Sequence, residues 1–122
     1  MNDKEYRAES RRVNAMLKKW SPFFSLDGWD IRVAIVRGHK GVSCAGESLA
    51  ADVTCQWQYM NAHMNVYAES TVEISDYELE ETIVHELVHI MVAELAPDVH
   101  SDSEERVVTG LARAFLRLAE KK

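Results

Sequence analysis

Residues 75–95 read SDYELEETIVHELVHIMVAEL. Ser75, followed three residues later by Glu78, forms a capping box, which is the pattern that opens a helix. Apolar side chains then recur at helical spacing along the segment: Leu79, Ile83, Leu87, Ile90, Met91 and Leu95. Pro97 follows, and proline cannot continue a helix. The segment therefore predicts an amphipathic helix that begins after Ser75 and ends near Leu95.

Within this helix, residues 85–89 form the motif His85-Glu86-Leu87-Val88-His89. Residues four apart on a helix lie one turn apart on the same face, so both imidazoles can reach one metal ion. Zinc accepts neutral imidazole nitrogens in a tetrahedral site and keeps one position for water when the site is catalytic. Glu86 lies about 100° around the helix from His85, where it can reach that water without competing as a ligand. The motif predicts one zinc ion per chain on His85 and His89, with Glu86 as the general base.

A third protein ligand would complete such a site, and three downstream residues are candidates. His100 lies in the loop after the motif helix. Glu104 lies near the centre of the apolar face of the next predicted helix, but it also occupies the glutamate position of a second capping box that begins at Ser101. Glu105 is left free on the flank of that helix. We favour Glu105 as the third ligand, with Glu104 and His100 as the alternatives.

The rest of the chain predicts helices at both ends and strands between them. Residues 3–20 have apolar side chains near helical spacing, and a Ser-Pro pair ends this pattern. Residues 29–36 alternate apolar and polar for most of their length, as a half-buried strand does. Residues 51–67 are rich in β-forming residues and indicate two strands with a bend near Met60-Asn61. Residues 71–74 are expected to add a short extended piece.

The last helix is expected to run to about Ala119, with one apolar face. That face comprises Val107, Val108, Leu111, Phe115 and Leu118. The order of elements predicts a single α+β domain over residues 1–122. It should consist of an N-terminal helix, a small antiparallel three-stranded sheet, the motif helix and a C-terminal helix.

Composition limits the class of protein and its partners. With 122 residues, of which 47% are hydrophobic, the chain is long enough for one domain with a core. A net charge of −6 without a run of Lys or Arg argues against nucleic acid as a partner. The polar N-terminus and the lack of a long apolar segment predict neither a signal peptide nor a membrane span. Cys44 and Cys55 are too few for a disulfide framework and are expected to be reduced thiols of a cytoplasmic protein.

The order of elements, the motif at residues 85–89 and the segment at residues 105–112, ERVVTGLA, together resemble the minimal gluzincin peptidases of bacteria and phages. The ImmA/IrrE-like proteins are the best-known relatives, and the SprT-like proteins are more distant. In the ImmA/IrrE-like pattern, a metal-binding Glu is followed by a small apolar residue at the third place and an aromatic-Ala pair at the sixth and seventh. Counted from Glu105, these places hold Val108, Leu111 and Ala112, which supports Glu105 as the ligand. Thr109 stands where thermolysin-type gluzincins have an Asp.

The resemblance implies a zincin-like minimal domain that hydrolyses a peptide bond in a peptide or protein substrate. It also implies that the substrate lies along an exposed edge strand and pairs with it through main-chain hydrogen bonds. Residues 62–66 are the expected strand, because they come just before the motif helix. Ala62 and Met64 would face one side, with Val66, and His63 and Asn65 the other.

An alternative from another class is a catalytically silent zinc-binding protein of phage origin, which would have the same fold and a regulatory or interaction role. The presence of Glu86 argues against this alternative, because a purely structural zinc site has no need of a general base.

Overall fold

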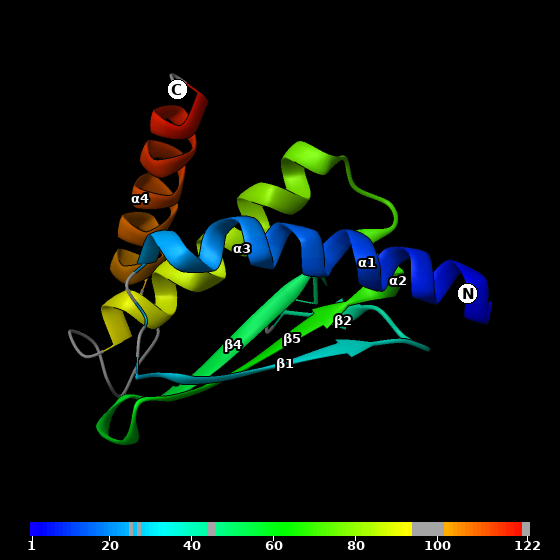
Figure 1. The fold of residues 1–122 in the computed structure, drawn as a ribbon, viewed down its shortest axis with the longest axis horizontal. Helices are drawn as coiled ribbons and strands as arrows, with labels where there is room; N and C mark the ends of the chain where they lie inside the picture. Colours follow the sequence, from blue (N-terminus) through cyan, green and yellow to red (C-terminus); the bar gives the residue numbers. More distant parts are fainter. Residues whose placement is uncertain (25, 27, 44–45, 94–101, 121–122) are drawn as a thin grey trace.

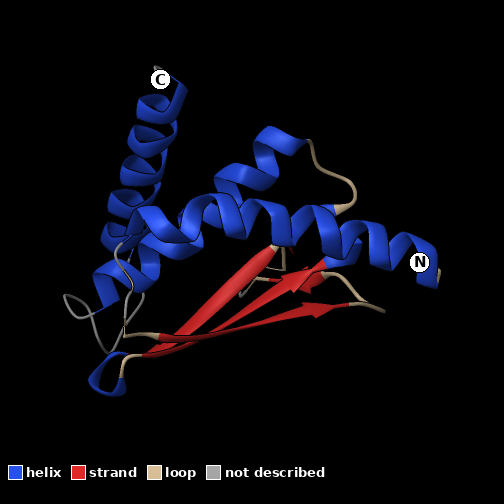
Figure 2. Ribbon diagram, viewed as in Figure 1, coloured by secondary structure: helices blue, strands red, loops and turns tan. Residues whose placement is uncertain are grey.

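The computed structural model describes residues 1–24, 26, 28–43, 46–93 and 102–120. These residues form an α+β structure with four α-helices, a three-stranded sheet and a separate two-stranded sheet. The helices gather over one face of the three-stranded sheet (Figure 2). No helix within the described ranges combines the length and apolar character that crossing a membrane requires.

Helix α1, Asp3–Trp20, begins and ends where the sequence predicts. Asn2 caps it through a capping box, in which the Glu5 amide donates to Asn2 Oδ1 at 2.8 Å and the Asn2 amide donates to Glu5 Oε1 at 3.4 Å. Val13 and Trp20 are buried on its inner face. The 3-10 helix η1, Ser21–Phe24, follows directly, because Pro22 cannot continue the α-helical hydrogen bonding.

The three-stranded sheet has the order β1-β5-β4, from strands β1, Asp30–Val36, β4, Ala51–Gln56, and β5, Asn61–Tyr67. β4 and β5 are antiparallel neighbours, whereas β1 and β5 are parallel. The expectation of a purely antiparallel sheet is therefore wrong. The chain leaves β1, crosses to the far edge as β4, and returns as β5 between the two. Because the chain reverses direction once between β1 and β4 and again between β4 and β5, strand β5 runs in the same direction as β1.

Strand β5 contains residues 62–66, and the expectation that they form an edge strand is wrong. The strand is central and is paired with a neighbour on each side, so its main chain cannot accept a further strand. Its predicted alternation is confirmed: Ala62, Met64 and Val66 are buried on the helix side, while His63 is exposed.

The connections between the strands of this sheet are a turn after β4 and a small hairpin after β1. The predicted bend after β4 is confirmed: η2, Trp57–Tyr59, leads to Met60, which turns the chain with a left-handed φ of 54°. The Gly-rich connection after β1 contains a small antiparallel hairpin of β2, Gly41–Val42, and β3, Ser48–Leu49.

The extended piece expected at residues 71–74 is not present. Helix α2, Ala68–Thr71, occupies part of it, and turn hydrogen bonds continue to Ile74, whose amide donates to the Thr71 carbonyl at 3.2 Å. β-forming residue types occur in this stretch, but it is too short for that local preference to outweigh the helical turn that begins at Ala68.

Helix α3, Asp76–Val92, carries the motif. Ser75 caps it as predicted, because its Oγ accepts from the Glu78 amide at 3.1 Å. Most of the helix is buried, since α1, β4 and helix α4, Asp102–Glu120, all pack against it. The predicted end near Leu95 lies outside the described residues.

Helix α4 stands against α3, away from the sheet (Figure 1). Val108, Ala112 and Leu116 are buried along one narrow stripe of α4, and the ring of Phe115 meets that of Phe24 edge-on at 5.2 Å. The predicted apolar face was too wide: Val107 and Leu118 are 53% and 59% exposed. They lie beside the stripe, where α3 does not reach.

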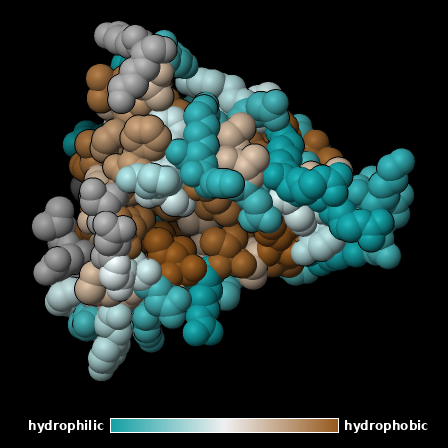
Figure 3. All heavy atoms as spheres, viewed as in Figure 1, coloured by the Kyte–Doolittle hydropathy of each residue, from teal (hydrophilic) through white to brown (hydrophobic). Residues whose placement is uncertain are grey.

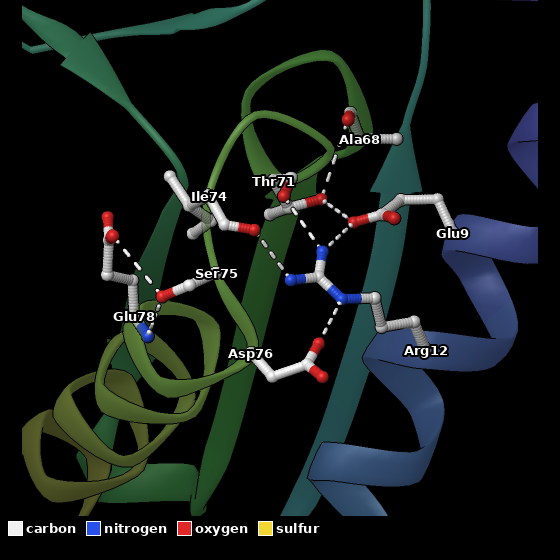
Figure 4. Close-up of polar contacts among 8 residues, drawn as sticks. All are labelled: Glu9, Arg12, Ala68, Thr71, Ile74, Ser75, Asp76 and Glu78. Atoms are coloured by element: carbon white, nitrogen blue, oxygen red, sulfur yellow. Dashed lines mark hydrogen bonds and ion pairs between the residues drawn. The ribbon is translucent and has the colours of Figure 1, made fainter.

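Arg12 fastens α1 to the segment that leads into α3 (Figure 4). Its guanidinium donates to the carbonyls of Thr71 and Ile74 at 2.9 and 2.7 Å and to Asp76 at 2.7 Å. It also donates to the buried carboxylate of Glu9 at 2.8 Å, which accepts from Thr71 Oγ1 at 2.6 Å. These bonds set where α3 starts, and hence where its motif lies.

Candidate metal centre

His85 and His89 lie on one face of α3, one turn apart, as the motif requires. Their rings meet edge-on with centroids 4.8 Å apart, and the two Nε2 atoms are separated by 3.2 Å. His89 is 4% exposed, whereas His85 is half-buried. The pair therefore presents two imidazole nitrogens to one point at the surface of the helix.

Glu105, in the first turns of α4, brings its carboxylate to the same point. Its Oε1 lies 3.0 Å from His89 Nε2, and its Oε2 lies 3.2 Å from His85 Nε2. His85, His89 and Glu105 form a group whose donor atoms are all close enough to hold one metal ion. Of the three residues weighed as third ligand, the structure brings Glu105 to both Nε2 atoms, and His100 lies outside the described residues.

The separations of these donors fit a tetrahedral ion. With ligand bonds of about 2.0–2.1 Å and tetrahedral angles, neighbouring donor atoms are about 3.3 Å apart. The separations here are 3.0–3.2 Å. Two imidazoles and one carboxylate are also a donor set that zinc binds in catalytic sites, where a fourth position remains for water. The residues present therefore fit a zinc ion.

Glu104 contacts the other ring nitrogen of His89, Nδ1, which faces away from Glu105. Its Oε1 lies 3.2 Å from His89 Nδ1, and its side chain is only 8% exposed. Because a carboxylate can only accept, this bond requires Nδ1 to carry the proton, which leaves a lone pair on Nε2. Carboxylates commonly hold metal-binding histidines in this way. The partner predicted for Glu104 in a capping box, Ser101, lies outside the described residues.

The protonation of His85 also suits a ligand. Burial, together with the neighbouring His89, lowers the pKa of His85, although Glu105 and Glu81 oppose the shift. The imidazole is therefore neutral near pH 7, and a neutral imidazole is the form that binds a metal ion.

Glu86 is 8% exposed and close enough to β4 for its charge to act on Cys55 of that strand. Burial, reinforced by the charges of Glu105 and Asp52, raises the pKa of its carboxyl to about 8. A divalent cation at the neighbouring centre would counter this shift by favouring the ionised form.

The edge strand β4 lies beside the centre, which the sequence did not indicate. Burial raises the pKa of Cys55 to about 11, and the charges of Glu86 and Glu104 add to this rise. The negative charge of Asp52, on the same strand, contributes to the raised pKa of Glu86. Nothing in the alternating pattern of β4 could reveal that it borders α3, because a period of two does not say what lies across the edge.

The residues expected to bind substrate lie elsewhere in the sheet. Ala62 and Met64 are buried in the core, at 4% and 0% exposure. His63 and Asn65 project from the opposite face, where His63 Nε2 lies 3.2 Å from Asn65 Oδ1 and Asn65 Nδ2 donates to Asp52 at 3.0 Å. None of the four lies on an edge strand, so the reason for assigning them to substrate binding does not hold.

Neither protein-family models, nor curated proteins, nor solved structures show a significant similarity to this chain.

Proposed function

We propose that the chain is a zinc-dependent peptidase of zincin-like architecture that hydrolyses a peptide bond with Glu86 as general base. The observation that carries the proposal is the convergence of His85 Nε2, His89 Nε2 and the Glu105 carboxylate, at separations of 3.0–3.2 Å. Three donors at this spacing, contributed by two helices, are what a tetrahedral ion needs. The motif on α3 places a buried carboxylate next to them.

His85, His89 and Glu105 would hold the metal, and Glu104 would keep the ring of His89 in place. When bound, zinc supplies Lewis-acid activation of water and of the scissile carbonyl. Glu86 then accepts a proton from the attacking water and delivers it to the leaving amine. Burial, reinforced by the charges of Glu105 and Asp52, raises the pKa of this carboxyl to about 8, and the charge of a bound cation would favour the ionised form that accepts the proton.

Strand β4 is the edge to which we assign the substrate. The Tyr67 amide donates to the Ala50 carbonyl at 2.9 Å, so the main chain of residue 50 points toward β5. Successive residues of a strand point to opposite sides, so Ala51, Val53 and Cys55 direct their N–H and C=O groups away from the sheet. An extended peptide can pair with this edge. Its Cys55 end lies beside Glu86 and Glu104.

Glu86→Gln tests the proposal. Gln preserves shape and helix propensity and leaves the metal ligands unchanged, so the variant should keep its zinc and its thermal stability. Loss of the base should slow peptide cleavage by about 10²–10⁴-fold. The assay incubates each protein with a proteome-derived peptide library and detects new termini by mass spectrometry. Glu78→Gln, an exposed change on the same helix, is the matched control and should cleave like the wild type.

Equal cleavage by wild type and Glu86→Gln would mean that the activity belongs to a contaminant and would contradict the proposal. Zinc binding without cleavage by either protein, together with a captured partner, would instead support the catalytically silent regulatory protein.

A further inference from the structure

Strand β1 forms the edge of the sheet opposite β4, and much of its outer main chain is open. The Asp30 amide donates to the Met60 carbonyl at 2.9 Å, so the main chain of residue 30 points toward β5. Because neighbouring strand residues point to opposite sides, the N–H and C=O groups that point outward belong to Ile31, Val33 and Ile35. The Tyr6 hydroxyl donates to the Ile35 carbonyl at 2.6 Å. Within the described ranges, no strand pairs with the remaining outward groups.

The same strand carries apolar side chains that α1 covers only in part. Val33 is 37% exposed, and Ile31 and Ile35 are half-buried. By contrast, Met64, which lies level with Val33 on β5, is fully buried. Figure 3 shows hydrophobic surface between the polar side chains of α1 and strand β1. An unpaired edge beside exposed apolar side chains is a surface that proteins usually cover.

Helix α1 borders this edge with a basic stripe, formed by the exposed side chains of Arg7, Arg11 and Lys18. These residues share one flank of the helix because they recur at intervals of four and seven residues. The buried Val13 separates the stripe from Arg12, which contacts the segment leading into α3. The basic stripe is therefore on the flank of α1 that faces away from α3, above the free edge of β1.

The charge of the basic stripe is not neutralised by the chain itself. In the part of the chain that the structure describes, its three cations form no ion pair, whereas Arg12 and Arg37 each bind a carboxylate. The chain as a whole has a net charge of −6, so this basic surface is local. Opposite charges across an interface favour the complementary partner. The open groups of β1 can pair with another extended main chain. Together the two features fit a segment that is both extended and acidic.

We infer that β1 takes up an extended acidic segment of a partner protein as an additional strand of the sheet. The main chain of the segment pairs with the outward groups of residues 31–35. Its side chains alternate, so every second one lies on the helix side. There an apolar side chain covers Val33, and carboxylates on either side of it meet the basic stripe. The candidate metal centre lies beside β4, at the far edge of the sheet, so the inference does not depend on catalysis.

A labelled heptapeptide, Thr-Glu-Thr-Val-Thr-Glu-Thr, tests the inference by fluorescence anisotropy. Its sequence reads the same in both directions, so its Val can lie opposite Val33 in either orientation, with one Glu toward each end of the basic stripe. A second peptide with Lys in place of both Glu should bind about tenfold or more weakly, because two attractive pairs become repulsive. The double variant Arg7→Glu/Lys18→Glu should reverse this preference. Arg113→Glu, an exposed change on α4, is the matched control and should bind both peptides like the wild type.

Amide hydrogen exchange locates the bound peptide. With the Glu peptide, the amides of Ile31, Val33 and Ile35 should exchange more slowly, whereas the amides along β4 should not change. Unchanged circular dichroism would show that the double variant remains folded.

Four results would overturn the inference. The first is a Glu peptide that does not bind at millimolar concentration, or that binds no better than the Lys peptide. The second is protection along β4 in place of β1. The third is slower exchange of the β1 amides at high protein concentration without peptide, since a second copy would then cover the edge. The last is tighter binding of a labelled oligothymidine than of the Glu peptide, which would assign the basic stripe to nucleic acid.

Discussion

His89 contacts both glutamates that begin α4, and each contact uses a different ring nitrogen. Glu104 meets Nδ1 at 3.2 Å and is 8% exposed, whereas Glu105 meets Nε2 at 3.0 Å and is 50% exposed. Consecutive helical residues point about 100° apart, so the two carboxylates reach the ring from different sides. Glu105 therefore lies where a ligand of the candidate centre would lie, and Glu104 lies where a group that orients such a ligand would lie.

Substitution of each glutamate by glutamine should separate these roles. Glu105→Gln replaces an anionic ligand with a neutral amide oxygen, a poor donor to zinc, and should nearly abolish binding. Glu104→Gln keeps an oxygen that can accept from His89 Nδ1. Removing such a supporting group lowers metal affinity by about 10- to 100-fold, so this variant should lose no more zinc affinity than that. Competition titration against a chelating dye measures both affinities. If Glu104→Gln lost the metal and Glu105→Gln kept it, the two roles would be reversed.

Helix α3 takes its position from polar contacts with α1 as well as from packing. Arg12 satisfies two carbonyls in the segment before α3 and one carboxylate in its first turn. Glu9, at 6% exposure, depends on Arg12 and Thr71 for its hydrogen bonds. By contrast, Lys19 pairs with Glu80 through a side chain that is 56% exposed, and the Trp20 indole also donates to Glu80. Loss of Arg12 would therefore remove hydrogen bonds from a buried carboxylate and from main-chain carbonyls, whereas loss of Lys19 would leave Glu80 with its bond from Trp20.

Arg12→Met should destabilise the fold far more than Lys19→Met. Removing Arg12 takes one of two donors from the buried Glu9 carboxylate, and it also removes the guanidinium bonds to the Ile74 and Thr71 carbonyls, of which Thr71 keeps the bond from the Ile74 amide. This should cost about 2–4 kcal/mol of unfolding free energy. Removing Lys19 breaks an exposed pair worth about 0–1 kcal/mol, and Trp20 still serves Glu80. Urea unfolding at a fixed zinc concentration measures both values. Equal losses in the two variants would show that the Arg12 bonds do not anchor α3.

The candidate metal centre takes its residues from two helices, α3 and α4, which also pack against each other. His85 and His89 belong to α3, which is buried among α1, the sheet and α4. Glu105 belongs to α4, which packs on α3 along a narrow stripe and on η1 through Phe115. An ion bound by both helices would therefore hold α4 more firmly to the body of the domain.

Zinc should accordingly raise the stability of the whole chain and change the dynamics of α4 most. A ligand that binds only the folded state at 100 times its dissociation constant adds about 2.7 kcal/mol. Thermal unfolding with zinc, and again after chelation, measures the global effect. Amide hydrogen exchange should show that chelation loosens α4 while the amides of β5 remain protected. An unfolding temperature that does not respond to zinc would contradict metal binding by the folded chain.

The longer helices and strands could be predicted because each has a local signature, whereas helix α2 and the β2–β3 hairpin were not predicted. Ser75 and Glu78 predict the start of α3, and Pro22 predicts the end of α1, because caps and proline act on the backbone within a few residues. The approach of His85 to His89 follows from the pitch of one helix, whatever surrounds it. The alternation of β5 likewise indicated which of its side chains share a face of the strand.

Relations between elements depended on the tertiary structure. The period-two pattern of residues 62–66 suits an edge strand and a central strand equally, and only pairing with β1 and β4 decided between them. The choice between Glu104 and Glu105 depended on how α4 meets α3, because the two residues are neighbours in the first turn of α4 and only the packing decides which carboxylate reaches the two Nε2 atoms. The exposure of Val107 and Leu118 followed from the same contact. Local periodicity shows which side chains of a helix or strand share a face. It does not show which other element packs against that face, because many segments with the same pattern could do so.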